Sequence, residues 1–169
     1  DGVTSIGNYA FYGCAGLSSV TIPNSVTSIG YCAFIGCRGL TSVTIPDSVT
    51  SIGQYAFSDC TGLTEILYNA KAAADLNSGS KVFYNAGSSS GGLRVVIGDS
   101  VERIPAYLFY GCTGLTEIIY NAKAAADLGY DSDVFSNAGT SSDGLRAVIG
   151  DSVERIPAHL FDGCTGLTS

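Results

Sequence analysis

The sequence predicts an α/β solenoid: a right-handed superhelix of about seven coils, with a parallel sheet on its concave face and short helical or 3₁₀ turns opposite. Three recurring landmarks predict it: a Phe followed three residues later by Cys or Ala, a Leu that opens a short apolar stretch, and Val-x-x-Ile before most of these Phe residues. Such periodicity indicates units that bury their apolar faces only against neighbouring copies. The recurring residues are Phe11, Phe34, Phe57, Phe83, Phe109, Phe135 and Phe161.

The repeat has two levels. Residues 49–100 and 101–152 are near copies of each other, and each copy joins an ordinary coil to a longer, divergent one. The Ser/Gly-rich stretches 88–92 and 140–144 lie inside the longer coils and are typical of loops, not of domain boundaries. We therefore expect residues 1–169 to form a single solenoid domain.

The two ends of the chain fall inside repeats, without the atypical capping units that solenoids need for solubility. The first residues have neither the basic start nor the apolar run of a signal peptide. We expect a fragment of a longer protein that lacks its caps, with the signal and the anchor outside this segment. Uncapped ends expose unpaired strand edges, which would allow self-association.

The first element of each coil is expected to be a short strand. Residues 40–45, Leu-Thr-Ser-Val-Thr-Ile, are rich in β-branched residues and precede a proline. Alternation along a strand places Val43 and Ile45 inward, and Ser42 and Thr44 outward.

The rest of the coil is expected to turn back across the solenoid. Residues 46–48, Pro-Asp-Ser, predict a turn, and residues 49–52 a second extended segment. Residues 55–60 are typical of one helical or 3₁₀ turn, with Gly62 ending it in the left-handed conformation. The Ala-rich stretches predict short true helices: residues 69–76 and 121–128.

The pattern Ile-Pro-x-Ser-Val-x-x-Ile-Gly-x-x-Ala-Phe-x-x-Cys-x-x-Leu-x-x-Val-x-Ile resembles the BspA-type leucine-rich repeats of bacterial surface proteins. The resemblance covers the whole chain, but residues 69–100 and 121–152 depart from it. There Ala86 and Ala138 replace Cys, and glycine replaces Pro. The resemblance implies a leucine-rich repeat solenoid that is secreted or surface-anchored, adheres to host proteins or other cells, and has no enzymatic activity, cofactor or inherited site residue.

Charge and hydropathy exclude several classes of partner. The net charge is −7 with eight Lys and Arg residues, whereas nucleic-acid binding needs a clustered basic face. The same balance argues against docking on an anionic membrane. No apolar run approaches the roughly 18–20 residues that span a bilayer.

Cysteine is expected to be structural. Five of the six cysteines hold one equivalent position, where side chains on neighbouring coils point the same way and cannot face each other as a disulfide requires. Ala replaces Cys at this position in two coils, which suits a small buried group. We expect buried free thiols, with Cys32 outside the column, and no zinc site, because no CxxC pairs with His.

Other candidate chemistry is weak. His159 is the only histidine, aligns with Tyr107 and lacks a nucleophile motif, so we expect a surface substitution and no catalytic residue. Asp127, Asp131 and Asp133 raise the question of calcium. The matching stretch of the sister module has largely lost these acids, which favours a solvated loop and no metal.

Two outward-facing columns are predicted along the sheet. We call Glu65, Arg94, Glu117 and Arg146 the charged column; it continues Ser19 and Ser42 of the first two coils. We call Leu67, Val96, Ile119 and Val148 the aliphatic stripe; it continues Thr21 and Thr44. Opposite charges on neighbouring strands fix the register, and a contiguous apolar patch marks an interaction surface. We therefore expect these eight residues to bind a partner.

Three alternatives remain open for the aliphatic stripe. β-Branched residues also stabilise an exposed sheet without any partner. The longer coils could fold over the stripe. The alignment could also be off by one in the longer coils, where Gly92-Leu93 and Gly144-Leu145 lie one residue closer to the strand.

The sequence as a whole favours a non-catalytic, extracellular or cell-surface recognition module that binds a protein of the host matrix or of another cell surface, or a glycan. A structural stalk without a ligand of its own is the alternative, supported by the near-identity of the two 52-residue modules. An enzyme is disfavoured, because no constellation of acid, base and nucleophile appears.

Overall fold

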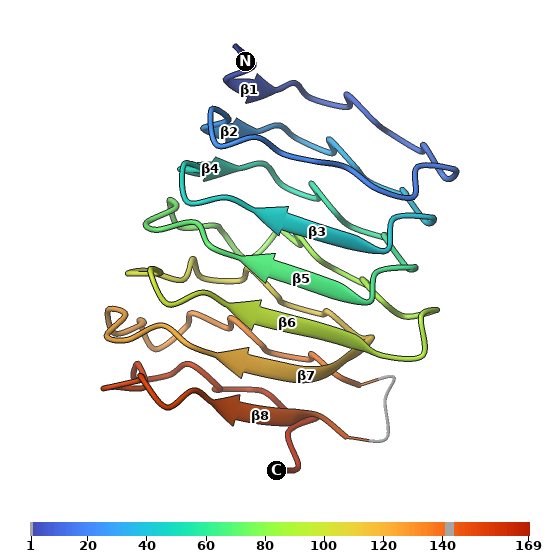
Figure 1. The fold of residues 1–169 in the computed structure, drawn as a ribbon. Helices are drawn as coiled ribbons and strands as arrows, with labels where there is room; N and C mark the ends of the chain where they lie inside the picture. Colours follow the sequence, from blue (N-terminus) through green and yellow to red (C-terminus); the bar gives the residue numbers. More distant parts are fainter. Residues whose placement is uncertain (1, 141–143) are drawn as a thin grey trace.

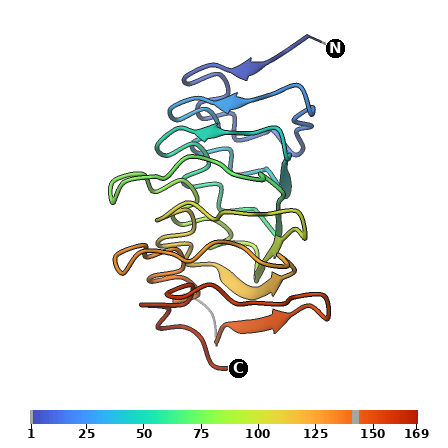
Figure 2. The ribbon, with the colours of Figure 1, turned by 90° about the vertical axis from the view of Figure 1, so that its left-hand side faces the viewer.

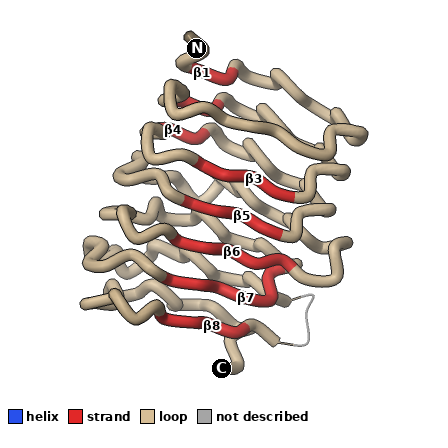
Figure 3. Tube along the Cα trace, viewed as in Figure 1, coloured by secondary structure: helices blue, strands red, loops and turns tan. Residues whose placement is uncertain are grey.

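The computed structural model describes residues 2–140 and 144–169. The chain winds into stacked coils whose strands all pair in parallel (Figure 1), which confirms the predicted solenoid. Figure 2 shows the stack after a quarter turn. Within the described residues Figure 3 shows strands and loops but no helix, so none is long and apolar enough to cross a membrane.

The strands form two sheets. The Val-x-x-Ile segments give a three-stranded sheet in the order β1-β2-β4, and the Leu-x-x-Val-x-Ile segments give a five-stranded sheet in the order β3-β5-β6-β7-β8. The first sheet consists of β1 (Ser5–Ile6), β2 (Ser28–Ile29) and β4 (Ser51–Ile52). The second consists of β3 (Ser42–Ile45), β5 (Glu65–Tyr68), β6 (Leu93–Ile97), β7 (Leu115–Tyr120) and β8 (Arg146–Ile149).

Side-chain alternation follows the prediction in β3. Val43 and Ile45 are buried, whereas Ser42 and Thr44 are exposed. The matching stretch of the first coil, residues 17–22, is described but forms no strand. The predicted columns therefore begin at the second coil, and Ser19 and Thr21 do not belong to the sheet.

The core is a column of stacked phenylalanine rings that runs along the solenoid. Centroids of successive rings lie between 4.9 and 5.8 Å apart, and the ring planes are within 23° of parallel. The five central rings are fully buried: Phe34, Phe57, Phe83, Phe109 and Phe135. Each such burial contributes about 1.5–3 kcal/mol, so the column is a large part of what holds successive coils together.

The segment after the second extended piece is a series of tight turns, and the predicted helical or 3₁₀ turn is not present. The backbone N–H of Tyr55 donates to the carbonyl of Ser80 at 2.7 Å, and that of Phe57 to Val82 at 2.9 Å. Between them, the N–H of Ser58 donates within its own coil, to the carbonyl of Tyr55 at 3.1 Å. Alternate N–H groups thus bond to the next coil, which a continuous helix cannot do.

The left-handed residues of this segment are not the glycine that the sequence suggests. Tyr55 and Asp59 have φ values of +58° and +56°, whereas Gly62 has no positive φ. Gly62 is needed for close approach instead: a Cβ built on it would lie 2.2 Å from the carbonyl oxygen of Arg38 in the preceding coil. The predicted left-handed role of Gly62 is therefore wrong.

The Ala-rich stretches form no helix but irregular backbone with bends, so the predicted helices at residues 69–76 and 121–128 are also wrong. The N–H of Ala74 donates to the carbonyl of Thr50, and that of Ala126 to Glu102, each at 2.9 Å. An isolated eight-residue helix is marginal because its nucleation is costly. Stacking gives these N–H groups partners in the neighbouring coil and buries Ala73, so packing overrides the helix propensity of alanine.

Replacing Gly62 by Ala should lower the free energy of unfolding by about 1–3 kcal/mol, because the new methyl group would overlap the backbone of Arg38. Urea unfolding followed by circular dichroism measures this. Gly16 holds the same repeat position, yet a Cβ there would meet nothing within 4 Å, so Gly16→Ala is the matched control. Equal losses in the two variants would contradict the close-approach explanation.

Candidate functional site

The candidate site is the outward face of the five-stranded sheet. The strand register places Glu65 opposite Arg94, Arg94 opposite Glu117, and Glu117 opposite Arg146. On the same strands the register joins the members of the aliphatic stripe in sequence: Leu67, Val96, Ile119 and Val148. The structure therefore brings all eight predicted residues together in two adjacent columns.

The alternative register is ruled out by an irregularity at the start of β6. Leu93 pairs with Leu115 and Arg94 with Glu117, so the register shifts between Leu93 and Arg94. In β7, Thr116 lies between the repeat Leu115 and Glu117, whereas in β6 Arg94 follows Leu93 directly. The register shift accommodates this one-residue difference. From Arg94 onward the columns remain in phase.

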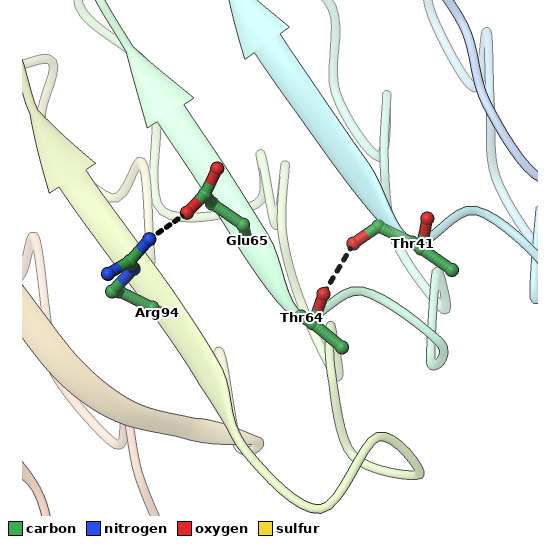
Figure 4. Close-up of polar contacts among 4 residues, drawn as sticks. All are labelled: Thr41, Thr64, Glu65 and Arg94. Carbon is green, nitrogen blue, oxygen red and sulfur yellow. Dashed lines mark hydrogen bonds and ion pairs between the residues drawn. The ribbon is translucent and has the colours of Figure 1, made fainter.

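The charged column is held by ion pairs between adjacent strands, β5 with β6 and β7 with β8. The Arg94 guanidinium donates to the Glu65 carboxylate (Figure 4), and Arg146 Nη1 lies 3.7 Å from Glu117 Oε1. The hydrogen bond that Arg94 donates to Glu65, together with the negative charges of Glu65 and Glu117, raises the pKa of Arg94. These pairs are exposed to solvent, so they mainly fix side-chain orientation and register.

The aliphatic stripe is only partly shielded. Each of its four residues is half-buried, so the described residues of the longer coils leave it partly open to solvent. The neighbouring inward residues Ile66, Val95 and Ile118 are buried. From β5 to β7 the stripe thus lies on a packed support, which limits the conformational entropy that a bound partner would remove. Beneath Val148 on β8 the support is more open, because Ala147 is half-buried and Ile149 is exposed.

A row of threonines at the start of the strands was not foreseen from the sequence. Thr64 Oγ1 donates to the carbonyl of Thr41 at 3.0 Å (Figure 4), and Thr116 Oγ1 donates to the carbonyl of Leu93 at 3.1 Å. Each hydroxyl ties its strand to the preceding coil just before the charged column begins. The recurrence of Thr directly after the repeat Leu was the available signal.

A second set of ion pairs lies outside the five-stranded sheet and was also missed. Arg103 pairs with Asp75, and Arg155 pairs with Asp127. Both partners recur at the 52-residue offset of the two modules, which is the signal that could have revealed them. The set also includes the pair Lys71–Glu102, at 3.1 Å.

Asp127 is already engaged by protein groups. Its carboxylate accepts a hydrogen bond from the backbone N–H of Ala158 at 2.8 Å, and this bond, followed by the charge of Arg155, lowers the pKa of Asp127. Over residues 2–140 and 144–169, no group of three or more His, Cys, Asp or Glu side chains is placed to hold a metal ion.

The single histidine makes a local contact. His159 Nδ1 lies 2.7 Å from Asp162 Oδ2, and its ring meets the ring of Tyr130 edge-on with centroids 5.7 Å apart. Its side chain is partly exposed and its φ is +61°. This placement agrees with a surface substitution at the position that Tyr107 holds in an earlier coil.

The cysteine column is structural in the middle of the chain. Cys37 Sγ donates to the carbonyl of Phe11 at 3.1 Å, and Cys60 Sγ donates to that of Phe34 at 3.2 Å. All six thiols are free, and Cys32 is buried outside the column as expected. Burial of the whole column is wrong for its ends, because Cys14 is exposed and Cys164 is half-buried.

Two buried tyrosines lie at the ends of their strands beneath the site. Tyr68 and Tyr120 are fully buried, and their hydroxyls have no hydrogen-bond partner among the described residues. Burial raises the pKa of both side chains, while the charges of Arg103 and Arg155 act in the opposite direction. Both hydroxyls therefore remain protonated across the physiological range and carry a desolvation cost.

The comparisons with known proteins agree with this geometry. A model of the BspA type leucine rich repeat region matches residues 1–116 and 77–169, in six copies. A solved leucine-rich repeat protein of T. pallidum is 29% identical with a TM-score of 0.64, over 98% of this chain and 72% of that one. No curated protein matches.

Two further solved structures are more distant in shape. A leucine rich cell surface protein of Faecalibacterium prausnitzii is 24% identical with a TM-score of 0.41, and a leucine-rich repeat protein of Bacteroides ovatus is 24% identical with a TM-score of 0.35. The alignments cover 99% and 98% of this chain, but only 57% of each of those proteins.

Replacing Tyr68 by Phe should raise the free energy of unfolding by about 1 kcal/mol, because it removes a buried hydroxyl without a partner and keeps the ring. Thermal or urea unfolding measures the change. Tyr130→Phe is the control, since Tyr130 is 80% exposed and should be neutral. A clear loss of stability in Tyr68→Phe would mean that the hydroxyl is bonded in solution.

Native-state alkylation should separate the cysteines. Burial raises the pKa of the Cys60 and Cys112 thiols, and the thiolate is the reactive form. With iodoacetamide at pH 8, Cys14 should be modified while Cys60 and Cys112 react only after unfolding in urea, as read by peptide mass spectrometry. Rapid modification of Cys60 in the folded chain would contradict a closed core.

Proposed function

Because the chain belongs to the BspA-type leucine-rich repeat family, we propose that it is a cell-surface or secreted recognition module that adheres to host proteins or to other cells. Leucine-rich repeat domains are generally non-catalytic scaffolds that mediate protein–protein interaction. The proposal adds the extracellular setting, the class of partner and the surface that binds it.

One observation carries the proposal: four aliphatic side chains remain half-exposed in one unbroken column across β5, β6, β7 and β8. A monomer rarely leaves such a column facing water without a role. The supporting backbone is paired on both sides of β5, β6 and β7, so these strands present the column without needing to rearrange on binding.

The proposed mode of binding follows from the chemistry of the two columns. Leu67 and Ile119, on strands separated by β6, would be central apolar anchors from which a partner displaces water. The charged column would form the polar edge, where solvated charges guide orientation more than they add affinity. Because Glu and Arg alternate, the edge would favour a partner that also carries both signs of charge.

The test is the double substitution Leu67→Glu and Ile119→Glu, which places two charges in the apolar column. The matched control is Ala74→Glu with Ala126→Glu, because these alanines are exposed, are separated by the same 52 residues and lie outside the sheet face. The chain is immobilised and exposed to an extract of extracellular matrix, and retained proteins are identified and titrated individually.

We expect the column variant to lose at least tenfold in affinity for the retained protein, with an unchanged circular dichroism spectrum, and the control to bind as the parent chain does. Equal binding by both variants would remove the sheet face as the site. If the parent chain retains no protein, the result would favour the alternative function, a stalk that spaces other domains. The near-identity of the 52-residue modules also favours that alternative.

A further inference from the structure

A cluster of tyrosines lies on the turns of the first three coils, outside the sheet columns. The ring of Tyr31 lies between those of Tyr9 and Tyr55, with centroids 5.3 and 6.1 Å away, and Tyr9 lies 5.8 Å from Tyr12. Tyr9 and Tyr12 are 53% and 63% exposed. We call these four residues the tyrosine cluster.

An open groove of about 400 Å³ adjoins the cluster, and Tyr12 belongs to both. Its lining includes Gly13 and Gly36, which hold one repeat position in successive coils and have φ values of +67° and +72°. The absence of side chains there leaves the surface hollow. Asp59 holds the same position in the third coil and also lines the groove.

The polar groups of the groove are one cation and one anion. Arg38 is exposed and makes no ion pair within the described residues, so its guanidinium N–H groups are available as donors. One carboxylate oxygen of Asp59 accepts a hydrogen bond from Asn85 Nδ2 at 2.8 Å, which orients the carboxylate beside the groove.

The surroundings of the groove are nearly free of charge. Residues 2–58 contain two charged side chains, Arg38 and Asp47, although the chain as a whole has 23. The other polar groups in this region are hydroxyls, amides and backbone groups. An anionic partner such as a nucleic acid would find a single cation here, and an ionic protein surface would find little to pair with.

We propose that the tyrosine cluster and the adjoining groove bind a neutral glycan chain. Aromatic rings present a negative face that attracts the polarised C–H groups of a pyranose, and the tyrosine hydroxyls add hydrogen bonds at the rim. Arg38 donates to sugar hydroxyls and Asp59 accepts from them, so together they orient one sugar unit. Successive tyrosines along the stack offer rings to successive units of the same chain.

This site is independent of the sheet face, because the tyrosine cluster and groove residues lie in the turn segments and share no residue with the two columns. A module with both surfaces would hold a protein with one and a polysaccharide with the other.

The test uses affinity electrophoresis through gels that each contain one polysaccharide: hydroxyethyl cellulose, xyloglucan, galactomannan, a β-1,3-glucan or amylopectin, with hyaluronan as the acidic arm. The variants are Tyr12→Ala with Tyr31→Ala, and Arg38→Ala alone. Tyr12 and Tyr31 are chosen because neither has a positive φ, whereas Tyr9 and Tyr55 do, so their replacement leaves the strained backbone unchanged. Tyr130→Ala is the control, since Tyr130 is exposed but lies in another part of the stack.

We expect at least one neutral gel to retard the parent chain, and the dissociation constant from the gel series to rise at least tenfold in the double variant and several-fold in Arg38→Ala. Tyr130→Ala and the Leu67→Glu, Ile119→Glu variant should be retarded like the parent. Absence of retardation in every neutral gel, retardation by hyaluronan alone, or equal loss in Tyr130→Ala would overturn the proposal. If the double variant unfolds by circular dichroism, Arg38→Ala decides, because its exposed side chain is not part of the core.

Discussion

Backbone hydrogen bonding between coils is the constraint on which the rest of the structure depends. On the turn side the N–H groups of Phe11 and Phe34 donate forward to the next coil, each at 2.7 Å. On the strand side, those of Thr27 and Gly53 donate back to the preceding coil, at 2.8 and 2.7 Å. Bonding on both sides fixes the separation of the coils. At this separation the phenylalanine rings stack, and glycine is needed at positions such as Gly62, where a Cβ would overlap the backbone of the neighbouring coil.

This constraint divides the chain into residues that hold the stack and residues that are free to vary. Inward positions and close-approach glycines are determined by the neighbouring coil. Outward positions on the strands and turns contact mainly solvent, and the copies differ at these positions. Ser and Thr on the first two coils are replaced by the charged column and the aliphatic stripe on the later coils. The tyrosine cluster lies on the turns of the first three coils. Recognition can therefore change along the solenoid without a change of fold.

The parallel pairing and the register of the two columns could be predicted, because each strand from β3 to β8 ends in the same apolar-x-apolar pattern. The inward and outward order could be predicted for β3 to β7 but not for β8 at the end of the stack, where Ile149 is 39% exposed. The Ala-rich stretches were wrongly predicted to be helical. The helix propensity of alanine is small compared with the stabilisation from the coil stacking that buries Ala73. The left-handed backbone at Tyr55 and His159 could not be predicted from the sequence, because bulky residues rarely adopt this conformation. The groove was also missed, since it needs Tyr12, Gly36 and Asp59 from three coils.

The 52-residue module has a further consequence at the level of the gene. Across the junction between the two modules, Asp75 pairs with Arg103 and Arg94 lies opposite Glu117; Asp127 pairs with Arg155 at the corresponding position after the second module. The lower surface of one module therefore matches the upper surface of its copy. Unequal recombination between the near-identical segments would add or remove a whole module and leave every junction with a partner it already fits. Array length can thus change in steps, with a similar gain in stability for each unit added.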